Sequence, residues 1–174
     1  MSRIPSLRKI LLLTFLFAML AAASSQAADD DPHRLGINVF GLSHHWDREL
    51  AHRNHADNEL NWGLGVEYEF ERTDRSRTFL DAGAYLDSGR NIAKFGGIGW
   101  QGRLGSSNFL AGGALVVFHS ETYYNNMPFL APVPLLTYEF KKASVTLFHF
   151  VKYENLNRVP VSGVFLTIPV AFGK

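Results

Sequence analysis

The feature that most constrains this chain is a series of long strand-like segments with no stretch of sustained helical periodicity. Eight such segments lie between turn signals. Each is about ten to thirteen residues long, whereas strands of soluble proteins usually run five or six. Segments of that length are typical of tilted strands that cross a bilayer. The expected bounds are 34–43, 61–72, 78–88, 92–104, 109–119, 128–140, 143–153 and 163–172.

The connections between these segments differ in length on the two sides of the expected sheet. Those after the second, fourth and sixth segments are short, at 73–77, 105–108 and Lys141-Lys142. Those after the first, fifth and seventh segments are longer and more polar. Short turns on one rim and mostly longer loops on the other are typical of outer-membrane barrels. The sequence therefore predicts an all-β protein, an eight-stranded antiparallel transmembrane β-barrel of the bacterial outer membrane.

Alternating side chains support this prediction in the second segment. Apolar residues there alternate with glycine and glutamate, so one face can meet lipid while the other points inward; the apolar residues are Leu64, Val66, Tyr68 and Phe70. An eight-stranded barrel has no room for an aqueous channel, but it can hold one slender ligand where interior side chains are small. Five glycines would either make that room or only ease strand curvature. They are Gly96, Gly97, Gly99, Gly112 and Gly113.

The first 27 residues have the build of an export signal. Arg3, Arg8 and Lys9 form a basic region, residues 10–20 an apolar region, and Ser25-Gln26-Ala27 a cleavage site of small residues. We expect residues 1–27 to be a cleaved signal peptide and residues 28–174 to be one outer-membrane β-barrel domain. The alternative is an uncleaved anchor helix, for which the apolar run is short.

Charge and cysteine content exclude several partners and chemistries. Without the three basic residues of the signal, 14 lysines and arginines remain against 16 acidic residues, which argues against nucleic acid as a partner. The chain has no cysteine, so thiol chemistry is not available. His52, His55 and Asp57 lie close in sequence, but a metal site normally needs three or four well-placed ligands, and we expect neither metal nor cofactor. A closed barrel has no edge strand that demands a partner, so we expect a monomer.

Polar residues suited to acyl transfer end two of the odd-numbered segments. His44 and His45 end the first segment, and Asp87 and Ser88 end the third. If the first strand rises from the periplasm, all four lie at the outer rim. A histidine can accept a proton from an attacking hydroxyl, an aspartate can orient the imidazole, and a serine can act as nucleophile or hydrogen-bond donor. The same residue types are also common in solvated loops and ordinary turns.

The order of these residues resembles that of the lipid A palmitoyltransferases of the PagP type. In that family a histidine at the end of the first strand is followed by a Trp-Gly-rich second strand and by Asp-Ser at the end of the third. The matching residues here are His44, Asn58-Glu59, Trp62-Gly63 and Asp87-Ser88, and their spacing favours His44 over His45. Further similar motifs are Gly97-Ile98-Gly99-Trp100, the prolines Pro128, Pro132 and Pro134, and Val145-Thr146.

The resemblance implies a specific reaction, in which palmitate moves from the sn-1 position of an outer-leaflet phospholipid to a hydroxyacyl chain of lipid A. It implies His44 as the general base, Asp87 as its partner and Ser88 as a further catalytic hydroxyl near the outer surface. It also implies that Gly97 and Gly99 belong to an acyl-chain pocket, with Gly99 at its floor. A larger side chain at that floor should shorten the chain that is accepted.

The prolines of the sixth segment have a physical consequence for the sheet. Because proline cannot donate to a strand ladder, Pro128, Pro132 and Pro134 should leave this strand incompletely paired with a neighbour. A gap of that kind at membrane depth would give a lipid lateral access to the interior. The alternative is an ordinary β-bulge.

Two other classes of function remain open. A lipid hydrolase, such as a lipid A deacylase or phospholipase, would use His44 with Ser88 or Ser43 to deliver water. A non-catalytic barrel would act in adhesion or envelope integrity, with loop 46–60 as its contact surface. The mutual orientation of His44, Asp87 and Ser88 separates this last class from the enzymes.

Overall fold

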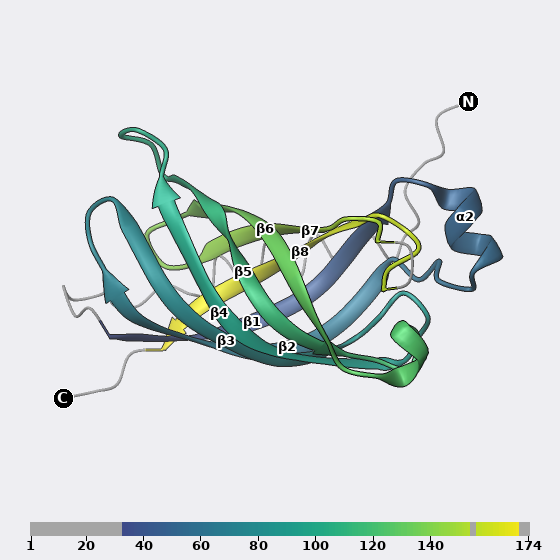
Figure 1. The fold of residues 1–174 in the computed structure, drawn as a ribbon. Coiled ribbons are helices and arrows are strands. Elements are labelled where there is room, and N and C mark those ends of the chain that lie inside the picture. The colour runs from purple at the N-terminus through teal and green to yellow at the C-terminus, as the bar shows by residue number, and fades with distance from the viewer. Residues whose placement is uncertain (1–32, 154–155, 171–174) are drawn as a thin grey trace, which may run out of the picture.

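The computed structural model describes residues 33–153 and 156–170, which form a closed barrel of eight antiparallel strands (Figure 1). Each strand pairs with the next, and the last pairs with the first. The strands are β1 (Arg34–His45), β2 (Leu60–Arg72), β3 (Ser76–Leu86), β4 (Ile92–Arg103), β5 (Phe109–His119), β6 (Phe129–Glu139), β7 (Ser144–Phe150) and β8 (Val161–Val170). The predicted fold is thereby confirmed. The expected signal peptide, residues 1–27, lies outside the described residues.

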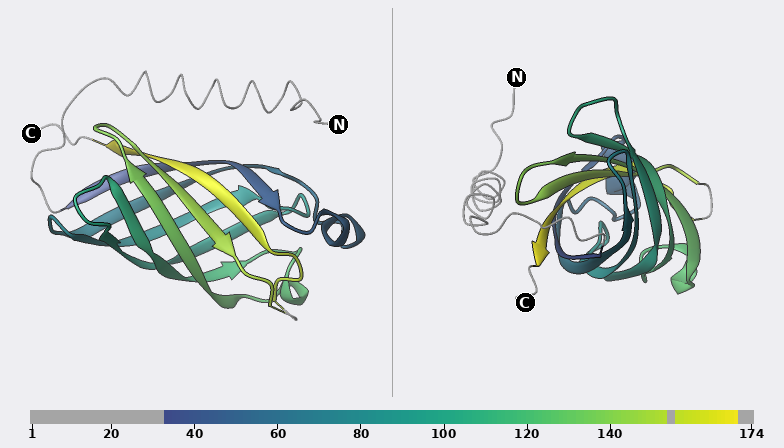
Figure 2. Two further views of the ribbon diagram at one scale, coloured as in Figure 1. Left: turned by 90° about the horizontal axis from the view of Figure 1, so that it is seen from above. Right: turned by 90° about the vertical axis from the view of Figure 1, so that its left-hand side faces the viewer.

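The two rims of the barrel differ in their connections. The short-turn rim carries the β2–β3, β4–β5 and β6–β7 turns. The long-loop rim carries helix α2 (Arg48–Arg53), the β3–β4 turn, the 3-10 helix η1 (Tyr124–Asn126) and the β7–β8 connection (Figures 1 and 2). Strand β3 ends at Leu86, two residues earlier than expected, because Asp87 and Ser88 belong to a tight turn. Strand β7 likewise ends at Phe150 instead of continuing to residue 153.

Helix α2 interrupts a connection that the sequence predicts to be a loop. The carboxylate of Asp47 caps it by accepting a hydrogen bond from the backbone N–H of Leu50 at 2.9 Å, and Ala51 is its buried residue. Its six residues are too few for a helical pattern of apolar side chains to be recognised. Within the described part of the chain, no helix is long and apolar enough to cross a membrane.

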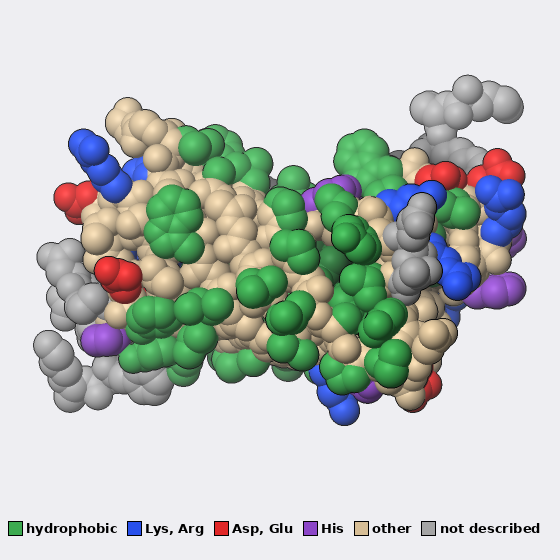
Figure 3. All heavy atoms as spheres, viewed as in Figure 1, with side chains coloured by type: hydrophobic (Ala, Val, Ile, Leu, Met, Phe, Trp, Pro, Cys, Tyr) green, Lys and Arg blue, Asp and Glu red, His purple; other side chains and the backbone are tan. Residues whose placement is uncertain are grey.

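The outer surface of the barrel is apolar around its middle. Figure 3 shows this on one face, with charged side chains gathered toward the two ends. As predicted, Leu64, Val66 and Tyr68 are exposed, whereas Glu67 and Glu69 between and beyond them are buried. Large outward-facing residues on six consecutive strands include Trp62, Leu64, Leu80, Ile98, Trp100, Leu115, Val117, Leu130, Leu136 and Leu147. Exposed apolar side chains in this arrangement are typical of a barrel surface that faces lipid.

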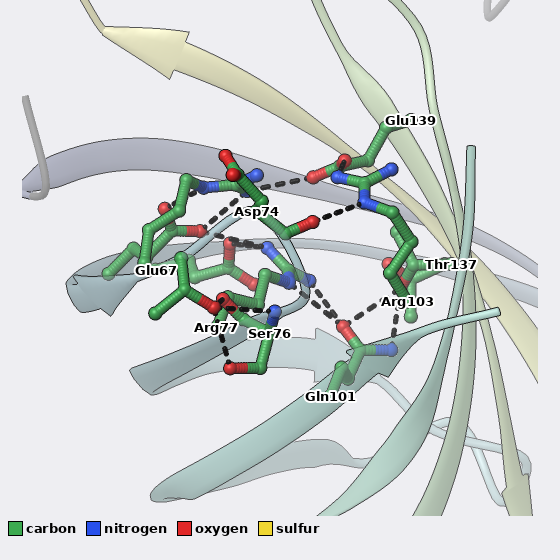
Figure 4. A network of polar contacts seen from close by, with 12 residues as sticks. Glu67, Asp74, Ser76, Arg77, Gln101, Arg103, Thr137 and Glu139 are labelled. Atoms are coloured by element: carbon green, nitrogen blue, oxygen red, sulfur yellow. Dashed lines mark hydrogen bonds and ion pairs between the residues drawn. The ribbon is translucent and has the colours of Figure 1, made fainter. Parts of the chain in front are cut away.

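The interior has a polar half toward the short-turn rim (Figure 4). The guanidinium of Arg77 donates to Glu67 at 2.7 Å and to Gln101 at 2.6 and 2.9 Å, and Gln101 donates in turn to Thr137 at 2.9 Å. Nearer the rim, Glu139 accepts hydrogen bonds from Arg72 and Arg103. These groups line this half of the lumen with charge, so the space for an apolar ligand lies in the other half.

The half toward the long-loop rim is lined by aromatic and aliphatic side chains. Phe40 lies at its centre, with its ring 5.2 Å from that of Tyr85 and 5.0 Å from that of Phe165 between centroids. The same buried cluster includes Val116, Phe118, Ala131, Val133 and Leu135. Burial of this apolar surface stabilises this half of the barrel.

A register shift in β1 exchanges the faces to which its last residues point. Phe40 pairs with Phe165 of β8, and Leu42 pairs with Val164, the residue before it. Two steps along β1 thus correspond to one step along β8, so β1 carries one extra residue at this position. Before the shift, Asn38 and Phe40 are buried in the interior. A one-residue change of register moves the following side chains to the opposite face of a sheet. The shift therefore decides which of the two terminal histidines of β1 enters the barrel.

Candidate active site

His45 and Ser88 form a hydrogen-bonded pair at the long-loop end of the interior. The Nε2 atom of His45 lies 2.9 Å from the Oγ atom of Ser88. The side chain of His45 is 2% exposed, whereas that of His44 is 51% exposed and packs edge-on against Trp46. The spacing argument that favoured His44 thus selects a residue that points out of the barrel. The structure brings His45 to Ser88 instead.

Asp87 organises the turn that presents Ser88. Its carboxylate accepts hydrogen bonds from the backbone N–H groups of Gly89 at 2.8 Å and Asn91 at 2.9 Å, and from the hydroxyl of Ser120. These contacts hold the β3–β4 turn in shape and tie it to the β5–β6 loop. Among the described residues, none of the hydrogen bonds of this carboxylate reaches His45. The expectation that Asp87 directly partners the histidine is therefore not met by the geometry.

A different carboxylate, that of Glu59, lies on the far side of the His45 ring. The Oε1 atom of Glu59 is 4.0 Å from Nδ1 of His45 and 3.5 Å from Nδ1 of His44. The guanidinium of Arg48 approaches the same oxygen at 3.4 Å. The imidazole of His45 is thus placed between a hydroxyl at Nε2 and a carboxylate at Nδ1. The sequence carries Glu59 only as part of the Asn58-Glu59 motif, which gives no sign of this contact.

Asn58 joins the loops that carry the histidine and the serine. Its side-chain amide donates to the carbonyl oxygen of Asp87 at 2.9 Å and to that of Leu60 at 2.8 Å. Its backbone N–H donates to the carbonyl oxygen of Ser88 at 3.0 Å. Since both partners of the His45–Ser88 pair are tied to this residue or its neighbour, their spacing is fixed by the two loops together.

Tyr123 adds a hydrogen-bond donor beside the serine. Its hydroxyl interacts with Ser88 from the β5–β6 loop, and burial raises the pKa of Tyr123 to about 12. The phenol therefore keeps its proton at every physiological pH. A neutral hydroxyl in this place can donate to an oxygen that develops negative charge at the serine.

An apolar cavity begins at Ser88 and extends into the barrel. Near the rim it is bordered by Ser43, Asn61, Asp87, Ser88, Tyr123 and Val161. A second space continues it toward the polar half, and the two share Tyr85, Phe118, Phe148 and Phe150 as walls. The deep part is bordered by Asp81, Ala114, Leu135 and Phe165. A narrow apolar cavity that starts at a hydroxyl–imidazole pair suits a hydrocarbon chain whose ester lies at the pair.

Glycines on two strands affect this interior in different ways. Gly97 and Gly99 of β4 face inward, but a Cβ atom at Gly99 would lie 2.3 Å from the ring of Phe79, and one at Gly97 would lie 2.2 Å from the carbonyl oxygen of Leu115. The ring of Phe79 thus occupies the space that Gly99 leaves, one inward position along β3 from Asp81, which borders the deep part of the cavity. Gly96 and Gly113 lie at outward-facing positions and do not widen the interior, contrary to one of the two sequence-based interpretations.

Strand β6 is incompletely paired, as its prolines predict. It pairs with β5 without interruption over residues 129–138, but its pairing with β7 covers only residues 135–139. Residues 129–134, which include Pro132 and Pro134, therefore have no ladder partner on β7, and Pro128 lies just before this segment. The interruption faces the apolar half of the interior, because Val133 on the inner side of the same segment borders the cavity.

Comparison with known proteins agrees with this fold. The model of one family, described as antimicrobial peptide resistance and lipid A acylation protein PagP, matches residues 26–161, which is most of the chain. The comparison with curated proteins gives no match. The matched region contains His45, Glu59, Ser88 and the incompletely paired β6. The chain therefore belongs to the PagP family of lipid A acylation proteins, as the order of its motifs predicted.

Proposed function

We propose that this protein is an outer-membrane acyltransferase that moves a palmitoyl chain from the sn-1 position of a phospholipid to lipid A. The observation that carries the proposal is the 2.9 Å contact between His45 Nε2 and Ser88 Oγ at the mouth of the apolar cavity. A base within hydrogen-bonding distance of a hydroxyl is the arrangement that activates a nucleophile. Membership of a lipid A acylation family supports lipid A as the acceptor.

The reaction begins at Ser88. The Oγ atom of Ser88 attacks the carbonyl carbon of the sn-1 ester while Nε2 of His45 takes the hydroxyl proton. The ester C–O bond then breaks, and the departing glycerol oxygen takes that proton from His45 to give a lysophospholipid. A hydroxyl of lipid A attacks the acyl-serine, again with its proton passing to His45. The new ester forms, Ser88 leaves as the alcohol, and His45 returns the proton to it.

Two neighbouring groups support the charges that appear during these steps. We assign to Glu59 the carboxylate role that the resemblance gives to Asp87, because Glu59 faces Nδ1 of the imidazolium. Asp87 holds the turn that carries Ser88. The protonated hydroxyl of Tyr123, which interacts with Ser88, would donate to the oxyanion of the tetrahedral intermediate.

The rest of the barrel would handle the lipid. The apolar cavity would hold the acyl chain, with its depth set by Phe79 and therefore indirectly by Gly99. The unpaired segment of β6, with Pro128, Pro132 and Pro134, would give the phospholipid lateral access from the bilayer. The apolar band would lie in the outer membrane, after removal of residues 1–27, and one chain would suffice because the closed barrel has no free edge.

Mass spectrometry of lipid A from cells that express the wild type, His45→Ala or Ser88→Ala tests this function. We expect lipid A to gain one palmitoyl group with the wild type and none with either variant, while all three barrels are present in the outer membrane. A loss of an acyl chain from lipid A would identify a hydrolase instead. No change with a folded wild-type barrel would favour a structural role.

A further inference from the structure

A chain of polar side chains crosses the membrane-facing surface of β7, β8 and the end of β1. The Nδ1 atom of His149 lies 2.9 Å from the Oγ atom of Ser162, and the indole N–H of Trp46 donates to the same oxygen at 2.9 Å. His149 points outward, because Phe148 and Phe150 on either side of it border the interior cavity. The reaction described above uses none of these three residues. Polar groups on the lipid-facing side of a barrel are costly unless they meet a polar partner.

This polar chain of hydrogen-bonded side chains, His149, Ser162 and Trp46, lies at the level of the active site, on the outer side of the barrel wall. His149 pairs with Ser162, and Ser162 pairs with His44. The next row toward the rim consists of Phe150, Val161 and His45, which face the interior. A ligand bound to the outer row would therefore be separated from the catalytic histidine by one layer of backbone.

The polar chain also borders the interruption between β6 and β7. The ladder between these strands ends at the pair of Leu135 and Phe148. His149 is the first residue of β7 beyond that pair, so it lies at the margin of the segment that has no partner on β6. His149 therefore borders the route of a lipid that uses this interruption.

The hydrogen bonds leave one proton donor available in either tautomer of the histidine. The indole of Trp46 can only donate, so Ser162 Oγ accepts from it. If the Ser162 hydroxyl donates to Nδ1 of His149, the ring proton resides on Nε2 and is directed away from Ser162. If Nδ1 donates to Ser162, the hydroxyl proton of the serine is the one left over. An anionic phosphodiester, which accepts hydrogen bonds and cannot donate them, complements both arrangements.

We propose that His149, Ser162 and Trp46 bind the phosphodiester group of the donor phospholipid on the outer surface of the barrel, beside the unpaired segment of β6. This inference rests on the proposed acyl transfer for its purpose, since the phosphodiester and the sn-1 ester belong to the same glycerol unit. Holding the phosphodiester at the level of His45 keeps the ester at the height of Ser88 while the acyl chain occupies the cavity.

A kinetic comparison of two donors tests the site within the full reaction. The purified barrel in a sugar-based detergent would be given dipalmitoylphosphatidylcholine or dipalmitoylglycerol, which lacks the phosphodiester. We expect His149→Leu and Ser162→Ala to raise the KM for phosphatidylcholine about tenfold, with kcat at saturation little changed. The wild type should prefer phosphatidylcholine over dipalmitoylglycerol, and in both variants this preference should largely disappear. Leu147→Ala, an outward-facing change on the same strand, is the matched control and should keep that preference.

A binding measurement tests the site without any turnover. Dodecylphosphocholine would be titrated into the labelled barrel in the same detergent, and the indole N–H signal of Trp46 would be followed by NMR. We expect a saturable shift in the wild type and in Ser88→Ala, and little or none in His149→Leu. The cation dodecyltrimethylammonium, which lacks the phosphodiester, should give no saturable shift.

The outcomes separate this site from the proposed reaction. Saturable binding by a barrel that transfers no acyl group would keep the phosphodiester site and reject the acyltransferase. Transfer by a barrel whose KM values are unaffected by His149→Leu and Ser162→Ala would reject the site. A response to lipid A in place of dodecylphosphocholine would also overturn the inference, because the phosphate recognised would then belong to the acceptor. Folding of each variant in cells is checked on gels, because a properly folded barrel changes its mobility when it is heated.

Discussion

Ser88 hydrogen-bonds to His45, and the adjacent His44 points away from the barrel interior. The two histidines therefore form a matched pair for mutation. We expect His45→Ala to lower kcat by about a thousandfold, because general-base catalysis is lost, and His44→Ala to leave kcat within about threefold of the wild type. Transfer of radiolabelled palmitate to lipid A in detergent measures both. Equal losses, or a larger loss at His44, would show that the buried pair is not the catalytic one.

The carboxylate that supports the imidazolium can be identified by isosteric changes. Glu59→Gln should lower kcat about tenfold to a hundredfold, because the negative charge facing Nδ1 of His45 is removed. Asp87→Asn should have a smaller effect, since an amide oxygen can still accept from the N–H groups of Gly89 and Asn91. The measurement is kcat at saturating donor for each variant. A larger loss for Asp87→Asn would return the role of histidine partner to Asp87.

The depth of the acyl-chain cavity should respond to Gly99. The Cβ atom of Gly99→Ala would lie 2.3 Å from the ring of Phe79, so the ring must move, and Asp81, the next inward residue of β3, borders the cavity. We expect the variant to prefer donors with acyl chains shorter than those that the wild type uses. Mass spectrometry of lipid A after reaction with a mixture of donors of defined chain length measures this preference.

The control for this change is Gly96→Ala on the same strand. A Cβ atom at Gly96 would face outward and lie 3.8 Å from its nearest neighbour, which is an ordinary contact. The wild-type chain-length preference should therefore remain in Gly96→Ala. If both variants behave alike, or if Gly99→Ala keeps the wild-type preference while folding normally, Phe79 does not set the depth.

Removal of the Tyr123 hydroxyl should affect both activity and the pH dependence of stability. We expect Tyr123→Phe to lower kcat by about a hundredfold, because a donor to the oxyanion is lost. Burial raises the pKa of Tyr123 to about 12, above its usual value near 10. The unfolded chain loses this proton at lower pH than the barrel does. The wild type should thus lose free energy of unfolding between about pH 10 and 12, relative to Tyr123→Phe, and show no such difference below pH 10.

Urea unfolding of the two barrels in lipid vesicles, followed by tryptophan fluorescence across this pH range, measures the difference in stability. Parallel curves at all pH values would mean that the phenol is solvated in the folded barrel. Unchanged kcat in Tyr123→Phe would separately remove this residue from the oxyanion site.

The polar half of the interior should depend on Arg77. Its guanidinium is buried and donates to Glu67 and Gln101, so Arg77→Met leaves a buried carboxylate without its cation. The expected loss in the free energy of unfolding is about 3–5 kcal/mol. The double variant Arg77→Met with Glu67→Gln should lose less, because no unpaired charge remains. Urea titration of both variants in vesicles measures this, and a cost below about 1 kcal/mol for Arg77→Met would show that water replaces the guanidinium.

Local pattern explains why the architecture could be predicted from the sequence. The long segments, the two-residue alternation around Leu64 and Val66, and the alternation of short and long connections are all properties of neighbouring residues. The incomplete pairing of β6 also follows from local chemistry, since Pro132 and Pro134 lack the N–H groups that a ladder needs. Asp87 and Ser88 could be placed at the same rim as the histidines because strand direction alternates along the chain.

Patterns along the chain therefore establish the barrel, its two rims and the residue types at the site. Which of these residues meet depends on how the strands and loops pack. The register shift after Phe40 occurs in the pairing of β1 with both β2 and β8, the latter far away in sequence, and it turns His45 inward and His44 outward. The contact of Glu59 with His45, and of Phe79 with Gly99, likewise depends on how neighbouring strands and loops pack. Alternation along one strand cannot reveal such contacts, because a single extra residue reverses every side chain that follows it.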